Sequence, residues 1–244
     1  MYSWITKRVK KFYNAQRFLP SAFGILFNPY WFVRRNLYKA ILANKKYLKG
    51  RLLDFGCGDK PYKELLNVKE YIGLDIVKSG HRHKNEQIDV FYDGKTIPFG
   101  NNHFDSVFSS EAFEHVSNLD EIIKELHRVL KPGGYILITV PFVWNEHEAP
   151  LDYARYTSFG LKRLLVESGF KIVSFKKSAN YVETLFQMWD TFVFESIIPP
   201  NFITRTILIP LFIAPATILG IIFSKLLPKN NSLYLSNIVV AQKK

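Results

Sequence analysis

The chain has 244 residues, of which 48% are apolar and 16% aromatic, so it can bury one sizeable core and is not expected to be disordered. The single cysteine, Cys57, excludes a disulfide framework and a cysteine-rich zinc site and fits a reducing cytosol. The formal net charge of +12 lies in the first 51 residues, because the basic residues from Lys7 to Arg51 all precede the first acid, Asp54. This asymmetry indicates an anionic partner, either lipid or nucleic acid, or a merely solvated basic face.

An uncharged stretch, FLPSAFGILFNPYWFV at 18–33, follows the first basic residues. Two prolines and a glycine interrupt it and no clean cleavage site follows, so we expect it to be retained rather than removed as a signal peptide. Tyr30 and Trp31 are residues that favour a membrane interface. Residues 1–49 are therefore predicted to form a basic, aromatic helical extension, and packed core remains an equal alternative to membrane contact.

From residue 51 onward, apolar strand patterns alternate with helical ones. The predicted order is a strand at 51–55, a helix from Pro61, strands at 71–76, 86–91 and 104–110, a helix at 118–130, a strand at 133–142, a helix at 157–169, and strands at 171–178 and 234–242. Ser158 is expected to cap the helix that it begins, and Gly169 to end it. Strands separated by helices predict a mostly parallel α/β sheet that binds ligands at the carboxyl ends of its strands.

The turn after the first strand, LLDFGCGDKPY, is rich in glycine. Gly56 and Gly58 allow the backbone to approach a ligand closely. Asp75 follows Asp54 by 21 residues, the spacing of an acid that accepts hydrogen bonds from ribose hydroxyls. A nucleoside-containing cofactor is predicted, but not a dinucleotide, because Lys60 stands in the part of the turn where a third glycine would be needed.

Five stretches in order resemble the class I S-adenosylmethionine-dependent methyltransferases: DFGCGD, YIGLDI, DVFYDGKTIPF, FDSVFSSEAFEHV and RVLKPGGYILITVPF. The resemblance covers residues 50–178 with a last strand near 235–242, and is greatest to the small-molecule branch with quinone-type and polysaccharide-cluster enzymes. It implies a Rossmann-like sheet of seven strands, mostly parallel, with the last strand antiparallel.

The resemblance also implies which residues hold S-adenosylmethionine. They are Asp54, Gly56 and Gly58 around the methionine part, Asp75 at the ribose, Ile76 against adenine, Asp93 and Gly94 beside the adenine amino group, and Ser109 and Ser110 under the reacting methyl. Lys60 and Pro61 depart from the family pattern, which leaves the conformation of the loop open.

The acceptor of the methyl group must be aligned, and a hydroxyl acceptor must lose a proton. Glu111, Glu114 and His115 follow the fourth strand at a spacing that would place them on one face of a helical turn. The resemblance implies either a catalytic role for His115 and Glu111, or a divalent metal site made by all three together with His147. We rank His115 as base or pocket residue ahead of a metal ligand, because two histidines are atypical for magnesium.

The segment LDYARYTSFGL resembles the stretch that polysaccharide-cluster relatives place over the acceptor. Arg155 would then bind a phosphate or carboxylate of the substrate, with Tyr153, Tyr156 and His147 beside it. The alternative, weighed evenly, is that Asp152 and Arg155 pair with each other on a loop.

Residues 206–224 carry no charge and approach the length of a membrane span. A single crossing is excluded if the strands at 171–178 and 234–242 share one sheet. Pro210 and Pro215 favour a kinked or re-entrant hairpin, or helices lying in the interface. A buried core helix or a dimer interface is the alternative.

Four segments are thus predicted: an extension at 1–49, a cofactor-binding core at 50–178, a membrane-associating insertion at 179–233 and a final strand at 234–244. The predicted function is O-methylation of a lipid-linked glycan or other membrane-presented small molecule. The predicted location is the cytoplasmic face of a membrane rich in anionic lipid, with peripheral or monotopic attachment. An RNA 2'-hydroxyl methyltransferase, which the apolar stretches disfavour, and a noncatalytic cofactor-binding scaffold are the alternatives.

Overall fold

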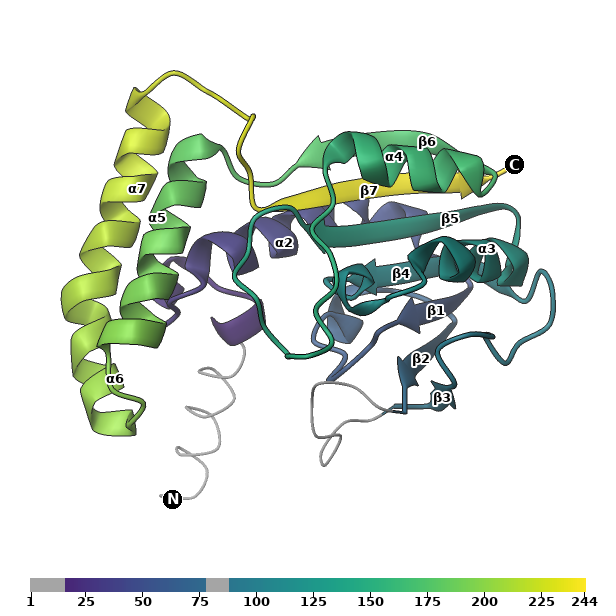
Figure 1. Cartoon of the computed structure of the whole chain (residues 1–244), viewed down its shortest axis with the longest axis horizontal. Coiled ribbons are helices and arrows are strands. Elements are labelled where there is room, and N and C mark those ends of the chain that lie inside the picture. Colours follow the sequence, from purple (N-terminus) through teal and green to yellow (C-terminus); the bar gives the residue numbers. More distant parts are fainter. Residues whose placement is uncertain (1–15, 78–87) are drawn as a thin grey trace. The chain divides into compact units, whose positions relative to one another are not determined.

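The computed structural model of the chain describes residues 16–77 and 88–244 (Figure 1). The start of the predicted N-terminal extension and the first two residues of the strand predicted at 86–91 lie outside this range. Contacts divide the chain into two compact units. The first, called the sheet unit, comprises Ile41–Lys176 and Ser236–Lys244, and the second, called the helical unit, comprises Met1–Ala40 and Lys177–Leu235.

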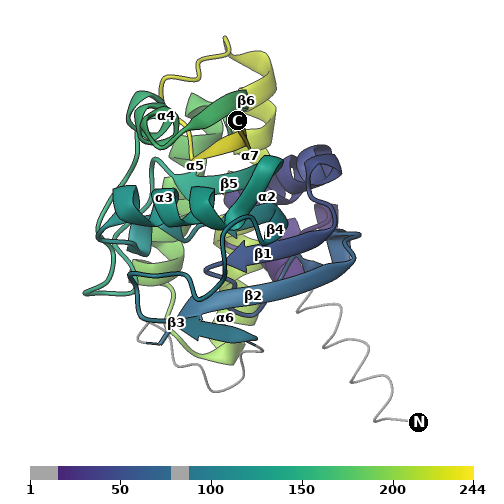
Figure 2. The same cartoon turned by 90° about the vertical axis from the view of Figure 1, so that its right-hand side faces the viewer.

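The sheet unit is built on one seven-stranded sheet in the order β3-β2-β1-β4-β5-β7-β6 (Figure 2). The strands are β1 Arg51–Phe55, β2 Glu70–Ile76, β3 Val90–Tyr92, β4 Phe104–Ser110, β5 Leu130–Pro141, β6 Phe170–Lys177 and β7 Ser236–Lys243. From β3 to β5 the neighbouring strands pair in parallel, whereas β7 pairs antiparallel with β5. The predicted Rossmann-like sheet with an antiparallel last strand is confirmed.

The helices beside the sheet are amphipathic, and their apolar faces complete its core. In α3, Leu119–Val129, the buried residues recur at helical spacing, as at Leu119, Ile122, Ile123 and Leu126. The helix α4, Ser158–Glu167, lies beside α3 (Figure 2) and buries Leu161 and Leu165 in the same core cluster. In central strands covered in this way, apolar residues follow one another instead of alternating with polar ones. This sequence pattern made their positions predictable.

Two details of the predicted helices are corrected. The cap of α4 is Thr157, whose side chain accepts a hydrogen bond from Gly160 N at 3.1 Å, and Ser158 is the first helical residue. Gly169 follows the helix with a φ of 91°, as expected of a stop residue. The helix predicted from Pro61 is wrong, because the β1–β2 connection contains only one 3-10 turn, η3 Lys63–Leu65. The residues before this turn form a loop in which Gly56, Gly58 and Lys60 have positive φ angles, so no helix can start there.

The helical unit gathers segments from both ends of the chain. Its elements are η1 Ala22–Leu26, the first part of α2 Trp31–Asn44, α5 Tyr181–Phe192, the π-helical turn η5 Val193–Ile197, α6 Phe202–Leu208, the π-helical turn η6 Ile209–Ile213 and α7 Ala214–Leu226. Helix α5 begins with a capping box, in which Asn180 and Glu183 bond to each other's backbone N–H.

The elements α6, η6 and α7 form one uninterrupted helical run, Phe202–Leu226, which packs alongside α5 (Figure 1). Pro210 lies in the π-helical turn and Pro215 directly after it, so the widened turn accommodates both missing N–H donors. Among the described residues this run is the one helix long and apolar enough to cross a bilayer. Because β6 and β7 belong to one sheet, the chain returns after the run.

Candidate functional site

The loop after β1 turns by means of two glycines with different neighbours. Gly56 has a φ of 69°, and a Cβ there would overlap the Cβ of Ala112. Gly58 has a φ of 43°, and a Cβ there would meet no atom within 4 Å. Gly56 is therefore required by the packing of the protein itself, whereas Gly58 faces open space that a ligand can occupy.

Asp75 joins the end of β2 to this loop. Its Oδ2 accepts a hydrogen bond from Gly58 N at 2.9 Å, and its Oδ1 accepts one from Ile76 N at 2.8 Å. A carboxylate at this position lies beside the glycine loop, where an acid that accepts hydrogen bonds from ribose hydroxyls is expected. Its position thus fits the predicted role.

Asp54 is buried at the end of β1 and accepts a hydrogen bond from the Tyr71 hydroxyl. Burial raises the pKa of Asp54 to about 7, although the bond from Tyr71 lowers it. Lys60, at the departure from the family pattern, is also buried and points to Asp89 Oδ2 at 2.6 Å rather than toward a ligand. Sequence reasoning gave no role to Tyr71 and Asp89, although they begin the stretches YIGLDI and DVFYDGKTIPF, because each meets its partner only through the pairing of the parallel strands.

The predicted adenine end of the site is assembled from Ile76 and Gly94. A Cβ on Gly94 would lie 3.1 Å from the Cδ1 of Ile76, so the glycine keeps this apolar side chain uncovered. The Oδ1 of Asp93 accepts hydrogen bonds from Lys95 N at 2.8 Å and Thr96 N at 2.9 Å. These bonds lower the pKa of Asp93 and hold the loop that presents it.

The end of β4 is fixed by its pairing with β5. The Ser110 and Thr139 hydroxyls lie 2.9 Å apart, and the ladder is extended by Glu111 N, which donates to Thr139 O at 2.8 Å. Glu111 then takes a φ of 51°, and its Oε2 accepts from Ser236 Oγ at 3.2 Å. The expectation that Glu111, Glu114 and His115 share a helical face is wrong, because the only turn is η4, Phe113–His115, and Glu111 still belongs to the strand end.

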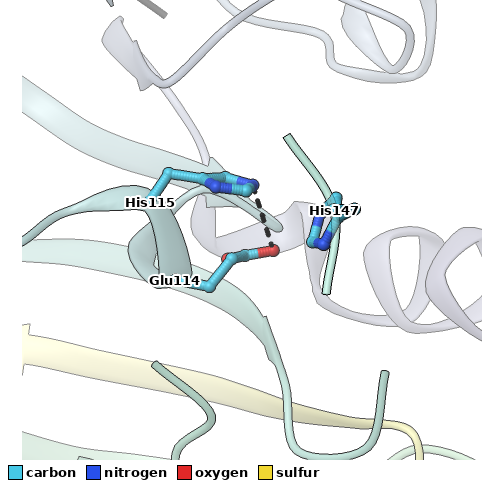
Figure 3. A group of neighbouring side chains, drawn as sticks. All are labelled: Glu114, His115 and His147. Carbon is cyan, nitrogen blue, oxygen red and sulfur yellow. Dashed lines mark ion pairs between the residues drawn. The ribbon is translucent and has the colours of Figure 1, made fainter. Parts of the chain in front are cut away.

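Glu114, His115 and His147 converge from two loops, as Figure 3 shows. One ligand atom from each lies within 4.8 Å of the others, and the two imidazole rings meet edge to face at 4.8 Å. Glu111 is not in this group. His115 Nδ1 lies 2.8 Å from Leu151 O, which assigns the ring proton to Nδ1 and leaves Nε2 as an acceptor.

The charges of this group are set by burial. Glu114 is 1% exposed, and burial, reinforced by the charge of Glu111, raises its pKa well above the ordinary value. Burial and the neighbouring His115 lower the pKa of His147. Within the described chain, Glu114 Oε2 and His115 Nε2 are buried without a hydrogen-bond partner, and His115 Nε2 lies 3.6 Å from Glu148 Oε1 and 3.9 Å from Glu114 Oε1 (Figure 3). The group therefore combines a carboxyl that retains its proton with an imidazole nitrogen ready to accept one.

The same three side chains have the spacing to hold a metal ion. One carboxylate and two imidazoles suit a first-row transition metal better than magnesium, which takes oxygen ligands. The raised pKa of Glu114 opposes metal binding at neutral pH, because the carboxyl must lose its proton to become a ligand. A bound cation would offset this effect, since its charge lowers the pKa of Glu114 again. The geometry thus permits either use, and the unpartnered His115 Nε2 is common to both.

Arg155 belongs to the loop beside this group. Its N–H groups reach both oxygens of Asp152 at 2.6 Å, Ala154 O at 2.9 Å, Asn145 O at 2.8 Å and Trp144 O at 3.3 Å. All five donors are therefore engaged within the loop, and none remains for a phosphate. Of the two readings weighed for Arg155, the structure supports pairing with Asp152 on the loop.

Asp152 and the two tyrosines complete the loop. Burial pushes the pKa of Asp152 up, but the hydrogen bonds from Arg155 and from His147 N outweigh it and hold the pKa at about 2. Tyr153 N donates to Glu114 O at 2.8 Å, and its ring is half exposed. Tyr156 O accepts from Asn237 Nδ2 at 2.7 Å. The loop is thereby tied to η4 and to β7, and the Tyr153 ring stays available to an acceptor.

Comparison with known proteins places these features in a family. Residues 53–138 match the family described as a methyltransferase domain. The mitochondrial ubiquinone biosynthesis O-methyltransferase of Mus musculus is 30% identical over 191 residues, covering 70% of this chain and 46% of that protein. Phthiotriol/phenolphthiotriol dimycocerosates methyltransferase 1 of Mycobacterium ulcerans is 30% identical over 114 residues, covering 43% of this chain and 42% of that protein. The chain spans less than half the length of either relative.

A solved S-adenosylmethionine-dependent methyltransferase from Mesorhizobium loti shares the fold, with a TM-score of 0.52 at 16% identity, covering 85% of this chain and 98% of that one. The strand order and the glycine turn after β1 define the Rossmann-like methyltransferase fold. Residues 53–138 thus match a methyltransferase domain, and the sheet that contains them has the Rossmann-like fold of the solved S-adenosylmethionine-dependent methyltransferase. This fold implies S-adenosylmethionine as the cofactor.

Proposed function

We propose that the protein transfers the methyl group of S-adenosylmethionine to a hydroxyl of a lipid-linked glycan or another small molecule presented at a membrane. The observation that carries the proposal is the buried Nε2 of His115 on the turn that follows β4, which has no hydrogen-bond partner among the described residues and faces the carboxyl groups of Glu148 and Glu114 at 3.6 Å and 3.9 Å. The apolar helical run Phe202–Leu226 supports an acceptor at a membrane. The two relatives, an O-methyltransferase of ubiquinone biosynthesis and a dimycocerosates methyltransferase, favour the same class of acceptor.

When bound, the cofactor supplies an activated methyl group, and the residues of this chain bind it and prepare the acceptor. Gly58 leaves room for it, Asp75 accepts hydrogen bonds from its ribose, and Ile76 contacts its base. His115 removes the hydroxyl proton with Nε2, while Leu151 O fixes the opposite nitrogen and thus the tautomer. Glu114 stays protonated and donates a hydrogen bond to the acceptor oxygen.

The acceptor class is tested by transfer of labelled methyl from S-adenosylmethionine to three pools: total lipid extract, purified RNA and water-soluble metabolites. We expect label in the lipid pool, lost when His115 is replaced by alanine. Mass spectrometry of the labelled lipid should show an increase of one CH2. Label in RNA that depends on His115 would instead establish the 2'-hydroxyl alternative, and cofactor binding without label in any pool would favour the scaffold.

Affinity for the cofactor is expected to rise with pH up to about 7. The pKa of Asp54 is about 7 before binding, and a bound cationic sulfonium would lower it, so binding releases a proton below that pH. Because the free protein is protonated there and the complex is not, affinity grows as pH increases and levels off above about 7. Calorimetry between pH 5.5 and 8 (roughly the span of the titration) measures the slope.

Asp54→Asn is the control for this pH dependence. The amide keeps the size of the side chain but cannot ionise, so we expect weaker binding and a flat profile over the same range. A slope that persists in Asp54→Asn would assign the proton to another group and remove Asp54 from the cofactor site.

A further inference from the structure

The contact between α5 and α7 is packed with polar and small side chains inward, although a separate part of the helical unit buries the apolar residues Val193, Ile198, Ile209 and Ile213. The buried positions of α5 are Thr184, Gln187, Asp190 and Thr191. The facing helix α7 buries small or polar residues as well: Ala214, Thr217, Gly220 and Ser224. A helix pair in water buries its large apolar residues and exposes its polar ones, so this arrangement is reversed.

The inward polar side chains are hydrogen-bonded to one another and to the backbone, except that Asp190 Oδ1 has no hydrogen-bond partner among the described residues. Thr217 Oγ1 donates to Asp190 Oδ2 at 2.8 Å, which joins α7 to α5. Gln187 Nε2 donates to Pro29 O at 2.9 Å, and its Oε1 accepts from Val33 N at 3.2 Å, which joins α5 to α2. These bonds give the three helices a fixed polar seam that does not depend on water.

Gly220 brings the helices close together along this seam. A Cβ at that position would lie 2.7 Å from the Cγ of Phe186 on α5 and 2.9 Å from the Cζ of Phe32 on α2. Small residues at helix contacts, with polar side chains bonded across them, are the packing mode of helices inside bilayers, where apolar burial cannot drive association.

The outward face of the same helices is apolar. On α5, Leu185, Trp189 and Phe192 are each about half exposed, and Trp189 is 53% exposed. On the run Phe202–Leu226, neighbouring pairs are exposed together, including Leu211 with Phe212 and Ile222 with Phe223. Adjacent residues point about 100° apart on a helix, so the exposed face is wide and not a narrow stripe. A contiguous apolar surface of this kind requires an occupant.

We propose that this outward face of α5 and the run Phe202–Leu226 is embedded in the acyl chains of a lipid bilayer, as a hairpin that enters and leaves on the same side. The polar contact between α5 and α7 favours lipid over a second copy of this chain as the occupant. A protein partner would cover only a narrow stripe of the helices, whereas lipid covers a wide face. The return of the chain to β7 excludes a single crossing.

The charges near this face agree with lipid as the occupant. Residues 196–242 contain no acid, and their basic residues, Arg205, Lys225 and Lys229, lie at or just outside the apolar stretch. Lys225 and Lys229 are exposed, so both can reach anionic headgroups at the bilayer surface. Arg205 stacks on the Phe194 ring, 4.2 Å from its centroid, which keeps this cation beside an aromatic surface.

The test uses flotation of the full-length protein with phosphatidylcholine vesicles, with and without phosphatidylserine. We expect stable binding to both, increased by phosphatidylserine and resistant to high salt and to a carbonate wash. Replacing two outward residues, Leu211→Glu with Ile218→Glu, should weaken binding about a hundredfold, because charges in the acyl region are costly. The matched control, Phe159→Glu with Val166→Glu, changes two exposed apolar residues of α4 and should bind as the unchanged protein does.

A second readout measures depth. Vesicles with brominated acyl chains should quench the fluorescence of Trp189, and the Trp189→Phe protein should lose that quenching. Salt-sensitive binding without quenching, or failure to bind either vesicle, would overturn the inference. A soluble dimer that dissociates in the Leu211→Glu, Ile218→Glu protein would instead make the face an interface between copies.

This inference extends the proposed function by stating how the protein reaches its acceptor, and the two fail separately. Vesicle binding without methyl transfer to lipid would contradict the proposed acceptor and leave the hairpin in place. Methyl transfer to lipid by a protein that does not bind vesicles would contradict the membrane hairpin and leave the proposed acceptor in place.

Discussion

Valine in place of Gly58 is expected to lower the affinity for S-adenosylmethionine by at least about a hundredfold, which corresponds to about 2.7 kcal/mol. A Cβ at Gly58 meets no protein atom within 4 Å, so the isopropyl group would occupy the open space that the cofactor needs. The substitution also forces a β-branched residue to a φ of 43°, at a cost of about 1–3 kcal/mol in stability. Calorimetry with the cofactor measures the first effect and thermal unfolding the second.

The chain offers a matched control at Gly133. This glycine also has a positive φ, 76°, and a Cβ there would also meet nothing within 4 Å, but it lies at the start of β5 and away from the carboxyl ends of the strands. Gly133→Val should therefore lose similar stability and keep its cofactor affinity. Equal losses of affinity in the two variants would mean that strain, and not a blocked cofactor site, explains Gly58→Val.

Replacing His115 with alanine is expected to reduce kcat by about 10²–10⁴-fold, the usual contribution of a general base, without changing the affinity for S-adenosylmethionine. The reason is that the contact of Nδ1 with Leu151 O fixes the ring and leaves His115 Nε2 without a hydrogen-bond partner. The cofactor loop, by contrast, consists of other residues. Turnover of the lipid acceptor and calorimetry with the cofactor give the two quantities.

Glu114→Gln separates a base from a metal site. Because burial keeps Glu114 protonated, the neutral amide reproduces its charge and shape, and we expect activity within a few-fold of the unchanged protein. If the group of Glu114, His115 and His147 bound a metal, the amide would remove an anionic ligand and the activity would fall together with metal content. His103→Ala, in a histidine stacked on Phe99, serves as the control for loss of an imidazole elsewhere.

The sheet could be predicted from sequence because its central strands are apolar runs bounded by turns. Strands β1 and β4 fall where the patterns of RLLDF and FDSVFSS placed them. The loop after β1 was less predictable: Lys60 takes a φ of 52° and buries its charge against Asp89, and neither feature has a local sequence signal. The helix expected from Pro61 was wrong for the same reason, since that loop consumes the residues that would begin it.

The site was partly predictable as well. The motifs identified Gly58, Asp75 and His115, but helical spacing misassigned Glu111, whose backbone continues the β4–β5 ladder. The inward orientation of Asp190 and Thr217 was not predictable, because an amphipathic pattern marks two faces and does not say which one meets the protein.

The position of β7 between β5 and β6 has a consequence for biosynthesis. This strand follows the apolar helical run in the sequence, so the edge of β5 that pairs with β7 stays open until Phe202–Leu226 has been synthesised. Until β7 pairs, the chain therefore presents two adhesive surfaces at once, an unpaired strand edge and a bare apolar helix, and a chain that does not reach lipid would be prone to aggregate.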